Sequence, residues 1–233
     1  MVNDSMGEKS QDQETIAVLA RLLGLSRRVI RCKYDEHFHL IELKLSSFER
    51  TILPPEIGHF PHLRSLHLRH SKLGQVPEEI SQLICLERLH LDHNQLTELP
   101  DVLWQLRNLR YLHLDHNQLS DLSPEIGLLR ELRSVDLSAN GLKHLPAEMG
   151  QLRNLRNLFL SQNRLATLPE FLRQLPSLLL LSTDGNPLTK ETLDRWKDLL
   201  PLHAPMNKDW PQRETAFDPA THDEERKIHD QSS

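Results

Sequence analysis

The chain has 233 residues and a formal net charge of −5 at pH 7; 38% of its residues are hydrophobic and only 5% are aromatic. This length fits one or two compact domains or one solenoid, and the mild acidity argues against a nucleic-acid-binding protein. The two cysteines, Cys32 and Cys85, do not suggest a disulfide framework. A reducing compartment is then the default, and we expect a cytoplasmic protein.

The beginning of the chain lacks the pattern of a secretory leader or a membrane anchor. No basic region leads into an apolar core, so no signal peptide is expected. The apolar run Ile16–Leu25 contains Arg21 and is too short to span a bilayer. We therefore expect no membrane insertion.

Residues 1–39 are expected to form a disordered start and a cap for the repeats that follow. Residues 1–13 are polar, which is typical of a disordered terminus. The apolar spacing from Glu14 to about Leu23 predicts a helix. Two strands are expected after it, over Arg28–Lys33 and His39–Leu45.

From residue 40 the chain repeats itself every 23 residues. The string LHLDHNQL occurs at 89–96 and again at 112–119. Seven units run through 40–188 without an insertion, and they begin at Leu40, Leu63, Leu86, Leu109, Leu132, Leu155 and Leu178. A fixed period of this length predicts a solenoid, because stacked units bury one continuous core that no single unit could bury.

Each unit is predicted to run as a strand, a turn and a return. Leu112 and Leu114 alternate with Tyr111, His113 and Asp115, which is the period of a half-buried strand. Beyond the strand the apolar spacing lengthens to three, which suits a loop and a short helical or 3₁₀ turn. Five units carry an asparagine eight residues after the start, and we expect these to form a structural ladder that pairs backbone groups of the turns: Asn94, Asn117, Asn140, Asn163 and Asn186.

The pattern LxxLxLxxNxLxxLPxx(I/L)xxL resembles a leucine-rich repeat. Its 23-residue period and the phrase LPxEIGxLxxL resemble the Ras-suppressor-like and plant intracellular Ras-group-related repeats, and the resemblance covers residues 40–188. It implies an α/β fold: a right-handed leucine-rich-repeat solenoid, or horseshoe, with a concave parallel sheet and helical caps. It also implies a binding role without catalysis, and it leaves the partner open because one fold serves many functions.

A helix over 189–200 is expected to cap the C-terminal end of the array, with Thr189 as its N-cap. From residue 201 to 233 the chain is a polar tail that we expect to be largely disordered, with Trp210 as a candidate to fold back or to bind a partner. The residues predicted to share the buried face of the helix are Leu193, Trp196 and Leu200.

Side chains that alternate with the core leucines are expected to line the concave side of the sheet. Neighbouring strands lie about 4.8 Å apart, so imidazoles there could stack or share a ligand, with Asp92 and Asp115 between them. Because no partner that would orient a metal ligand is evident, we favour duplication of a histidine-containing unit and a solvated polar face, and assign no metal and no cofactor. Six histidines fall on this side, in two columns: His67, His90 and His113, and His70, His93 and His116.

The concave side is also the predicted partner-binding surface. Tyr111 and Phe159 are expected as exposed aromatic anchors, which are typical of protein interfaces. Trp104 occupies a slot that most units fill with Gly or Ser, and it is expected to be exposed on the convex side. The predicted partner-binding residues are Arg69, Arg88, His90, Asp92, His93, Tyr111, His113, Asp115, His116, Asp136 and Phe159.

No catalytic signature is present: there is no glycine-rich phosphate loop, GxSxG, CxxC or HExxH. We expect a non-catalytic protein–protein interaction module or scaffold that binds a protein partner through the concave face. No nucleic acid and no small-molecule substrate is expected. The alternatives are a metal- or pH-responsive binding module that uses the histidine columns, and a substrate-targeting arm of a bacterial effector or of a larger signalling or ligase assembly.

Overall fold

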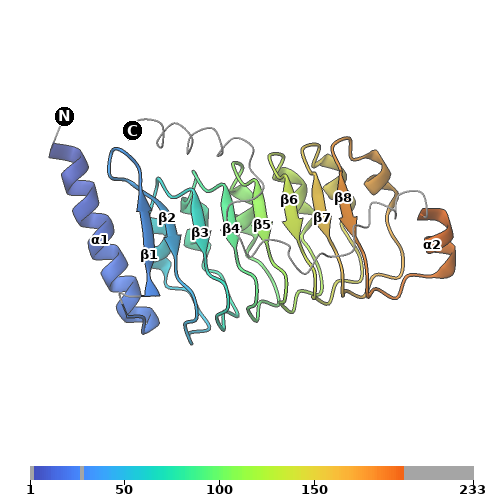
Figure 1. Cartoon of the computed structure of the whole chain (residues 1–233), viewed down its shortest axis with the longest axis horizontal. Coiled ribbons are helices and arrows are strands. Elements are labelled where there is room, and N and C mark those ends of the chain that lie inside the picture. The colour runs from blue at the N-terminus through green and yellow to red at the C-terminus, as the bar shows by residue number, and fades with distance from the viewer. Residues whose placement is uncertain (1–2, 27–28, 197–233) are drawn as a thin grey trace, which may run out of the picture. The chain divides into compact units, whose positions relative to one another are not determined.

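The computed structural model describes residues 3–26 and 29–196, with side chains from residue 11 onward, and all of these residues belong to one compact unit. The predicted tail 201–233 with Trp210, and the end of the predicted cap helix at 197–200, lie outside the described residues. In the described part, α1 (Asn3–Leu23) comes first, a series of strands and 3₁₀ turns follows, and α2 (Lys190–Trp196) comes last (Figure 1). The strands are β1 (Arg31–Tyr34), β2 (Leu40–Lys44), β3 (Ser65–His67), β4 (Arg88–His90), β5 (Tyr111–His113), β6 (Ser134–Asp136), β7 (Asn157–Phe159) and β8 (Leu180–Ser182). The 3₁₀ turns are η2 (Pro55–His59), η3 (Glu78–Gln82), η4 (Asp101–Gln105), η5 (Pro124–Leu128), η6 (Ala147–Gln151) and η7 (Glu170–Gln174).

The strands form one sheet whose order follows the chain from β1 to β8. β1 pairs antiparallel with β2, and every later pair is parallel. The register keeps the 23-residue period, so that Leu66 pairs with Leu89 and Leu89 with Leu112. Side chains at equivalent positions of consecutive units therefore lie side by side on neighbouring strands.

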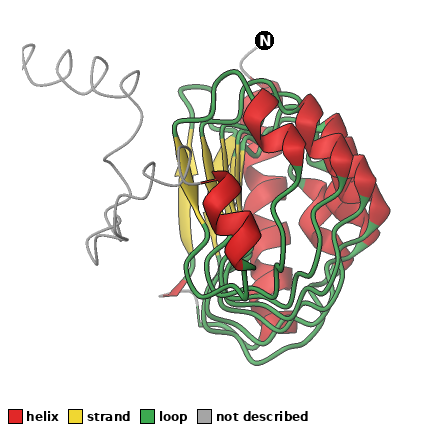
Figure 2. Ribbon diagram, turned by 90° about the vertical axis from the view of Figure 1, so that its right-hand side faces the viewer, coloured by secondary structure: helices red, strands yellow, loops and turns green. Residues whose placement is uncertain are grey.

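The repeated leucines fill one core between the sheet and the 3₁₀ turns. Leu112 and Leu114 are fully buried, and Leu103 of η4 reaches the same core from the other side. Figure 2 shows the strands on one side of the stack and the helical turns on the opposite side. The short helical turn expected in each unit is confirmed, and most of these turns follow a proline whose fixed φ holds the chain extended before the turn.

The asparagine of each unit ties its turn to the preceding unit. Asn117 Nδ2 donates to Leu91 O of the preceding unit at 2.9 Å and to Leu114 O at 3.0 Å, while its Oδ1 accepts from Leu96 N–H at 3.0 Å. Ser71 fills the slot in an earlier unit and accepts one backbone N–H at 3.3 Å. The same pattern of bonds recurs at Asn94, Asn140, Asn163 and Asn186.

The residue before this slot adopts a left-handed backbone conformation in unit after unit. The φ angle is 56° at His93 and 55° at His116, and the N–H of His93 donates to Asp115 O of the next unit at 2.9 Å. A side chain other than glycine costs about 1–2 kcal/mol in this region, so the turn itself imposes the conformation. The other positions of this column are Ser47, His70, Ala139, Gln162 and Gly185.

At the N-terminal end, α1 covers the first strands of the array. Leu19 and Leu23 are buried in the common core, and Asp12 Oδ2 accepts from Leu40 N–H at 3.1 Å. The helix begins at Asn3, so the prediction of a disordered start is wrong for residues 3–13. Once its C-terminal half is fixed by packing, each further residue gains a helical hydrogen bond at little cost, and the helix extends through polar sequence.

At the other end, α2 begins after Thr189, whose Oγ1 accepts from Thr192 N–H at 3.1 Å. Trp196 is 1% exposed and packs into the core, with Arg173 Cζ 4.5 Å from the ring centroid. Leu193 is 44% exposed, so its predicted place on the buried face is wrong, and Thr192 is buried instead. Neither α-helix of the described part combines the length and apolar character needed to cross a bilayer.

Trp104 contradicts the prediction of an exposed convex side chain. It lies in η4, is 1% exposed and belongs to the core. A ring of this size gains more by packing against the leucines than by facing water. Its Nε1 has no hydrogen-bond partner, so the indole is held by packing alone.

Candidate functional site: the sheet face

The sheet face is defined here as the side of β2–β8 that points away from the leucine core, together with the residues that directly follow each strand. The resemblance makes this the concave side. Packing between equivalent side chains is close enough to bury His67 and Asp92 and to leave Arg88 and Tyr111 half-buried. The face is therefore a packed polar layer rather than a row of fully solvated side chains.

The inner histidine column is a stack of imidazoles on β3, β4 and β5. The ring centroids of His67 and His90 are 4.2 Å apart, and those of His90 and His113 are 4.5 Å apart, with interplanar angles of 8° and 15°. Arg69 Nη2 lies 3.1 Å from His90 Nδ1, and because guanidinium only donates, this nitrogen of His90 accepts and is unprotonated. Burial, followed by the charges of its two neighbours, holds the pKa of His90 well below the usual range, and burial also lowers the pKa of His113. Within the inner column, His90 and His113 are thus held in the neutral form.

The outer histidine column lies in the left-handed turns just after the strands and is exposed. The rings of His93 and His116 stack with centroids 4.1 Å apart at an angle of 11°, whereas His70 and His93 are 4.3 Å apart but tilted by 41°. His116 Nδ1 lies 3.0 Å from Asp115 Oδ2, and His93 Nδ1 lies 3.8 Å from the same oxygen. Burial, with the neighbouring imidazoles, lowers the pKa of His93.

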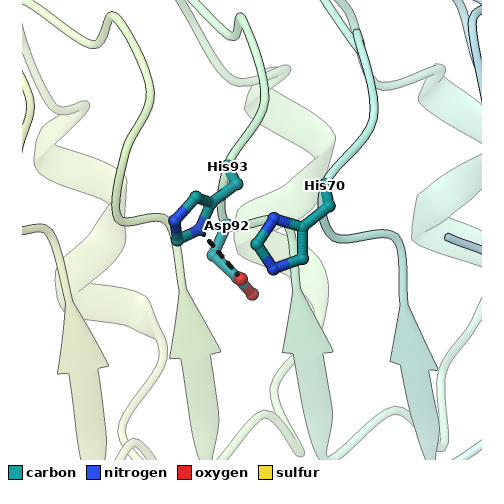
Figure 3. A group of neighbouring side chains, drawn as sticks. All are labelled: His70, Asp92 and His93. Atoms are coloured by element: carbon teal, nitrogen blue, oxygen red, sulfur yellow. Dashed lines mark ion pairs between the residues drawn. The ribbon is translucent and has the colours of Figure 1, made fainter. Parts of the chain in front are cut away.

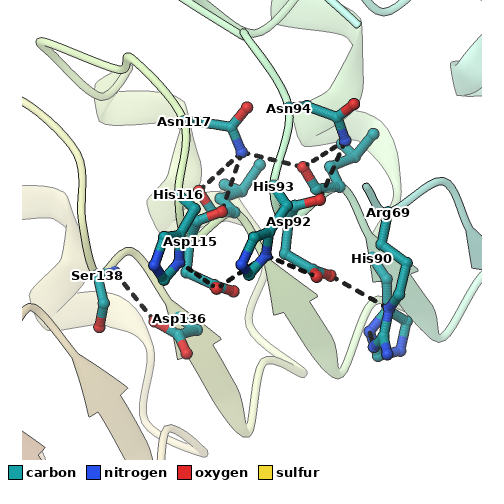
Figure 4. A network of polar contacts seen from close by, with 12 residues as sticks. Arg69, His90, Asp92, His93, Asn94, Asp115, His116, Asn117, Asp136 and Ser138 are labelled. Carbon is teal, nitrogen blue, oxygen red and sulfur yellow. Dashed lines mark hydrogen bonds and ion pairs between the residues drawn. The ribbon is translucent and has the colours of Figure 1, made fainter. Parts of the chain in front are cut away.

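Two carboxylates, Asp92 and Asp115, lie between the two columns, and a third, Asp136, continues the inner column on β6, in register with His113. Asp92 is 6% exposed; its Oδ1 lies 3.5 Å from Arg69 Nε and has no hydrogen-bond partner. Asp136 Oδ1 accepts from Ser138 N–H at 2.9 Å, and burial, reinforced by the charge of Asp115, raises the pKa of Asp136 to about 7. Figure 4 shows how these acids, the outer histidines and the asparagine amides form one network.

The described residues contain three groups of side chains that could hold a metal ion. In each group one ligand atom per residue lies within 4.8 Å of the others. Figure 3 shows the first group, with His70 and His93 on either side of Asp92. The groups are His70, Asp92 and His93; His93, Asp115 and His116; and His113, Asp115 and Asp136.

The two predicted aromatic anchors have different environments. Tyr111 is half-buried, and Arg88 Cζ lies 5.5 Å from its ring centroid, a cation–π contact across β4 and β5. Phe159 is only 5% exposed, so the prediction of an exposed anchor is wrong. Its neighbours in register on the adjoining strands are Asp136 and Ser182.

The structure brings most of the predicted residues into one patch and adds some that the sequence analysis missed. Arg69, His90 and Asp92 are joined by direct contacts, whereas Phe159 lies two strands beyond β5. His39 and His62 form a further stacked pair with centroids 4.0 Å apart. These two residues are one 23-residue period apart, so the repeat spacing carried that signal.

At the N-terminal edge of the face, an ion cluster was also missed. Glu42 Oε2 lies 3.4 Å from Lys33 Nζ, and Glu42 Oε1 lies 3.2 Å from Lys44 Nζ. Although burial opposes ionisation, the bond to Lys44 and the nearby positive charges give a net lowering of the pKa of Glu42. Lys33 is on β1, which pairs antiparallel with β2, and this pairing is not evident from the repeat pattern.

Stacked 23-residue units, a parallel sheet on one side, 3₁₀ turns on the other and an asparagine ladder define an α/β solenoid of the leucine-rich-repeat class. The family described as "Leucine-rich repeat region" matches residues 101–214, and "Leucine rich repeat" matches residues 61–119. The chain is a leucine-rich-repeat protein. These matches define the class and do not extend to the Ras-suppressor-like subtype.

Two solved structures are similar to this chain. A leucine-rich-repeat protein of Leptospira interrogans is 31% identical over 70% of this chain and 53% of its own, with a TM-score of 0.47. The functional domain of InlJ from Listeria monocytogenes, which includes a cysteine ladder, is 25% identical over 66% of this chain and 32% of its own, with a TM-score of 0.56. The chain thus spans about half of the first protein and a third of the second. No curated protein sequence matches it.

Proposed function

We propose that this chain is a non-catalytic interaction module, or scaffold, that binds a protein partner through the sheet face. The observation that carries the proposal is the pair formed by Arg88 and Tyr111 at the centre of that face. Arginine and tyrosine are the residue types that most often dominate the energy of protein interfaces, and both are half-buried, which pre-orders them for docking.

The charges around this pair favour a protein over other classes of partner. The face carries both positive and negative side chains: Arg69 lies 3.5 Å from Asp92, and Arg88, Asp115 and Asp136 lie on the same face. A polyanion such as a nucleic acid requires a surface of predominantly positive charge. A partner with its own mixed charges can complement this pattern, and such complementarity sets register and specificity.

A cytoplasmic location and a role in signalling belong to the same proposal. Cys32 and Cys85 are both free and half-buried, which suits a reducing compartment. Burial also raises the pKa of Cys32, which keeps its thiol protonated and unreactive. Leucine-rich-repeat relatives support binding in general and do not specify the partner.

The test compares capture of a partner by the parent and by two double variants. Arg88→Ala with Tyr111→Ala removes the central pair, and the matched control, Arg130→Ala with Arg153→Ala, removes two exposed arginines outside the sheet face. The partner that the parent recovers is then titrated against each purified variant. Two anchors worth more than about 1 kcal/mol each should together weaken binding by at least about 30-fold, and the control should leave it unchanged. Equal affinity of both double variants would place the interface elsewhere.

A further inference from the structure

Two imidazole nitrogens in the outer column converge on a single carboxylate oxygen. Asp115 Oδ2 is 3.0 Å from His116 Nδ1 and 3.8 Å from His93 Nδ1, and the ligand atoms of all three residues lie within 4.8 Å of one another. Tetrahedral zinc bonds its ligands at about 2.0–2.1 Å, which places ligand atoms roughly 3.3 Å apart. The two observed separations bracket that value, and the stacked imidazoles must tilt so that both ring nitrogens point at one ion. We propose that His93, Asp115 and His116 form a site for a divalent transition-metal ion of the zinc type.

The backbone holds these ligands in place. His93 and His116 are both in the left-handed turn that every unit repeats, and their N–H groups donate to Asp115 O and Ser138 O at 2.9 and 3.0 Å. The ring centroids are 4.1 Å apart, which keeps both imidazoles beside the carboxylate of Asp115. Ligands fixed by regular structure in this way give a pre-organised site.

The other two groups are poorer candidates. In the group of His70, Asp92 and His93, the carboxylate of Asp92 already faces Arg69 Nε at 3.5 Å, and this guanidinium repels a metal cation. Since the Nδ1 of His93 faces both Asp92 and Asp115, one ion at His93 excludes a second that uses the same nitrogen.

The third group uses Asp115 again, together with His113 and Asp136 on the strands. The ring of His113 is stacked in the inner column, against His90. An ion there would compete with the preferred site for the carboxylate of Asp115. We therefore infer one ion per chain in the repeat array.

The ligand set also indicates the chemical class of the ion. Two imidazoles and one carboxylate suit zinc, cobalt, nickel or copper, whereas magnesium and calcium select oxygen ligands. The side chains of His93 and His116 are 39% and 52% exposed. The remaining coordination positions therefore face solvent, where water or a donor from another molecule can complete the shell.

Substitutions for the test are provided by the repeat itself. Gln162 occupies the same left-handed position in a later unit, and Ser138 occupies the position equivalent to Asp115. His116→Gln and Asp115→Ser should therefore fold, and circular dichroism with thermal melts verifies this. His70→Gln is the matched control, because it removes an exposed histidine of the same column and conformation outside the proposed site.

The experiment titrates untagged full-length protein, free of partner, with Zn²⁺ by calorimetry, and with Co²⁺ while its absorption spectrum reports the coordination. We expect one tight equivalent, a loss of at least about tenfold in affinity for His116→Gln and Asp115→Ser, and parental affinity for His70→Gln. Histidines elsewhere contribute equally weak binding to every variant. The proposal is overturned if no saturable equivalent is seen, or if His70→Gln weakens binding as much as His116→Gln. Because no partner is present, either failure leaves the proposed protein-binding function untouched.

Discussion

Removing the amide of Asn117 is a direct test of what the ladder does for this fold. In the parent, Asn117 accepts one backbone hydrogen bond and donates several. The carbonyls that it contacts have a second donor, since Leu91 O also accepts from Asn94 and Leu114 O also accepts from Asn140, each at 2.9 Å. The group that loses its acceptor in Asn117→Ala is the N–H of Leu96.

The magnitude follows from this asymmetry. A buried N–H without a partner costs about 1–3 kcal/mol, and the loss of the donated bonds places the expected cost of Asn117→Ala in the upper part of that range, about 2–3 kcal/mol. Asn117→Ser should cost about as much, because the hydroxyl of Ser71 in the equivalent slot accepts from Phe48 N–H and not from the N–H that corresponds to that of Leu96. Gln118→Ala, at the exposed neighbouring residue, is the control and should stay within about 0.5 kcal/mol of the parent.

Asn117→Asp separates the two roles of the amide. A carboxylate keeps the acceptor for Leu96 N–H but faces the carbonyls of Leu91 and Leu114 without a proton to donate. The pKa of the new group is therefore raised in the folded state, and stability should fall as pH rises above about 4, the ordinary pKa of Asp. All variants are compared by chemical denaturation followed by circular dichroism. If Asn117→Ala is as stable as the control Gln118→Ala, the ladder amide does not stabilise the turn.

Three further outcomes are expected. Leu114→Ala removes a fully buried side chain and should lower the free energy of unfolding by about 2–5 kcal/mol in the same denaturation assay; a change below 1 kcal/mol would contradict the core assignment. Asp136→Asn should stabilise metal-free protein, because the pKa of this buried acid is raised from its ordinary value of 3.8 to about 7 and the folded state of the parent loses stability as pH rises through that range. The increase in the free energy of unfolding should therefore grow between pH 5 and 7 and then level off. An increase that becomes smaller as pH rises would refute this. Trp196→Ala should open the C-terminal end of the core and lower the melting temperature, with Leu193→Ala as the exposed control on the same helix; equal melts for both would reject the cap.

The fold was predictable in detail because the repeat encodes both strand register and core. The core leucines recur every 23 residues, and stacked units bury them only when equivalent residues lie side by side. This gives the observed pairing of Leu66 with Leu89. Errors occurred where a residue departed from the repeat. Trp104 and Phe159 are large rings in slots that other units fill with small or polar groups, and their neighbours cover them. The repeat pattern predicts which positions point away from the core, but it does not predict how much of a large ring at such a position is buried by its neighbours.

The histidine columns illustrate the same distinction within the candidate site. Spacing predicted which imidazoles lie side by side, and the rings of His67, His90 and His113 do stack. The sequence could not show that the inner column is largely buried while the outer one is exposed. That difference depends on the path of the backbone just after each strand. The left-handed turn at His93 and His116 is detectable only in coordinates, since neither residue is a glycine or asparagine.

The ladder and the proposed metal site share one structural cause. The left-handed residue turns the chain so that the following asparagine points inward to the backbone of two units, and the same turn directs the preceding acid and its own ring outward. In unit after unit, therefore, the geometry that stabilises the fold also sets the residue before the left-handed position beside the side chains of two consecutive turns. Whether that place binds a metal depends only on which residues fill it: Asp115 with His93 and His116 provide donor atoms, whereas Ser138 with Ala139 provides none of comparable strength. A binding site can thus arise on this solenoid by substitution at solvent-facing positions, without any change in the buried positions that maintain the repeat.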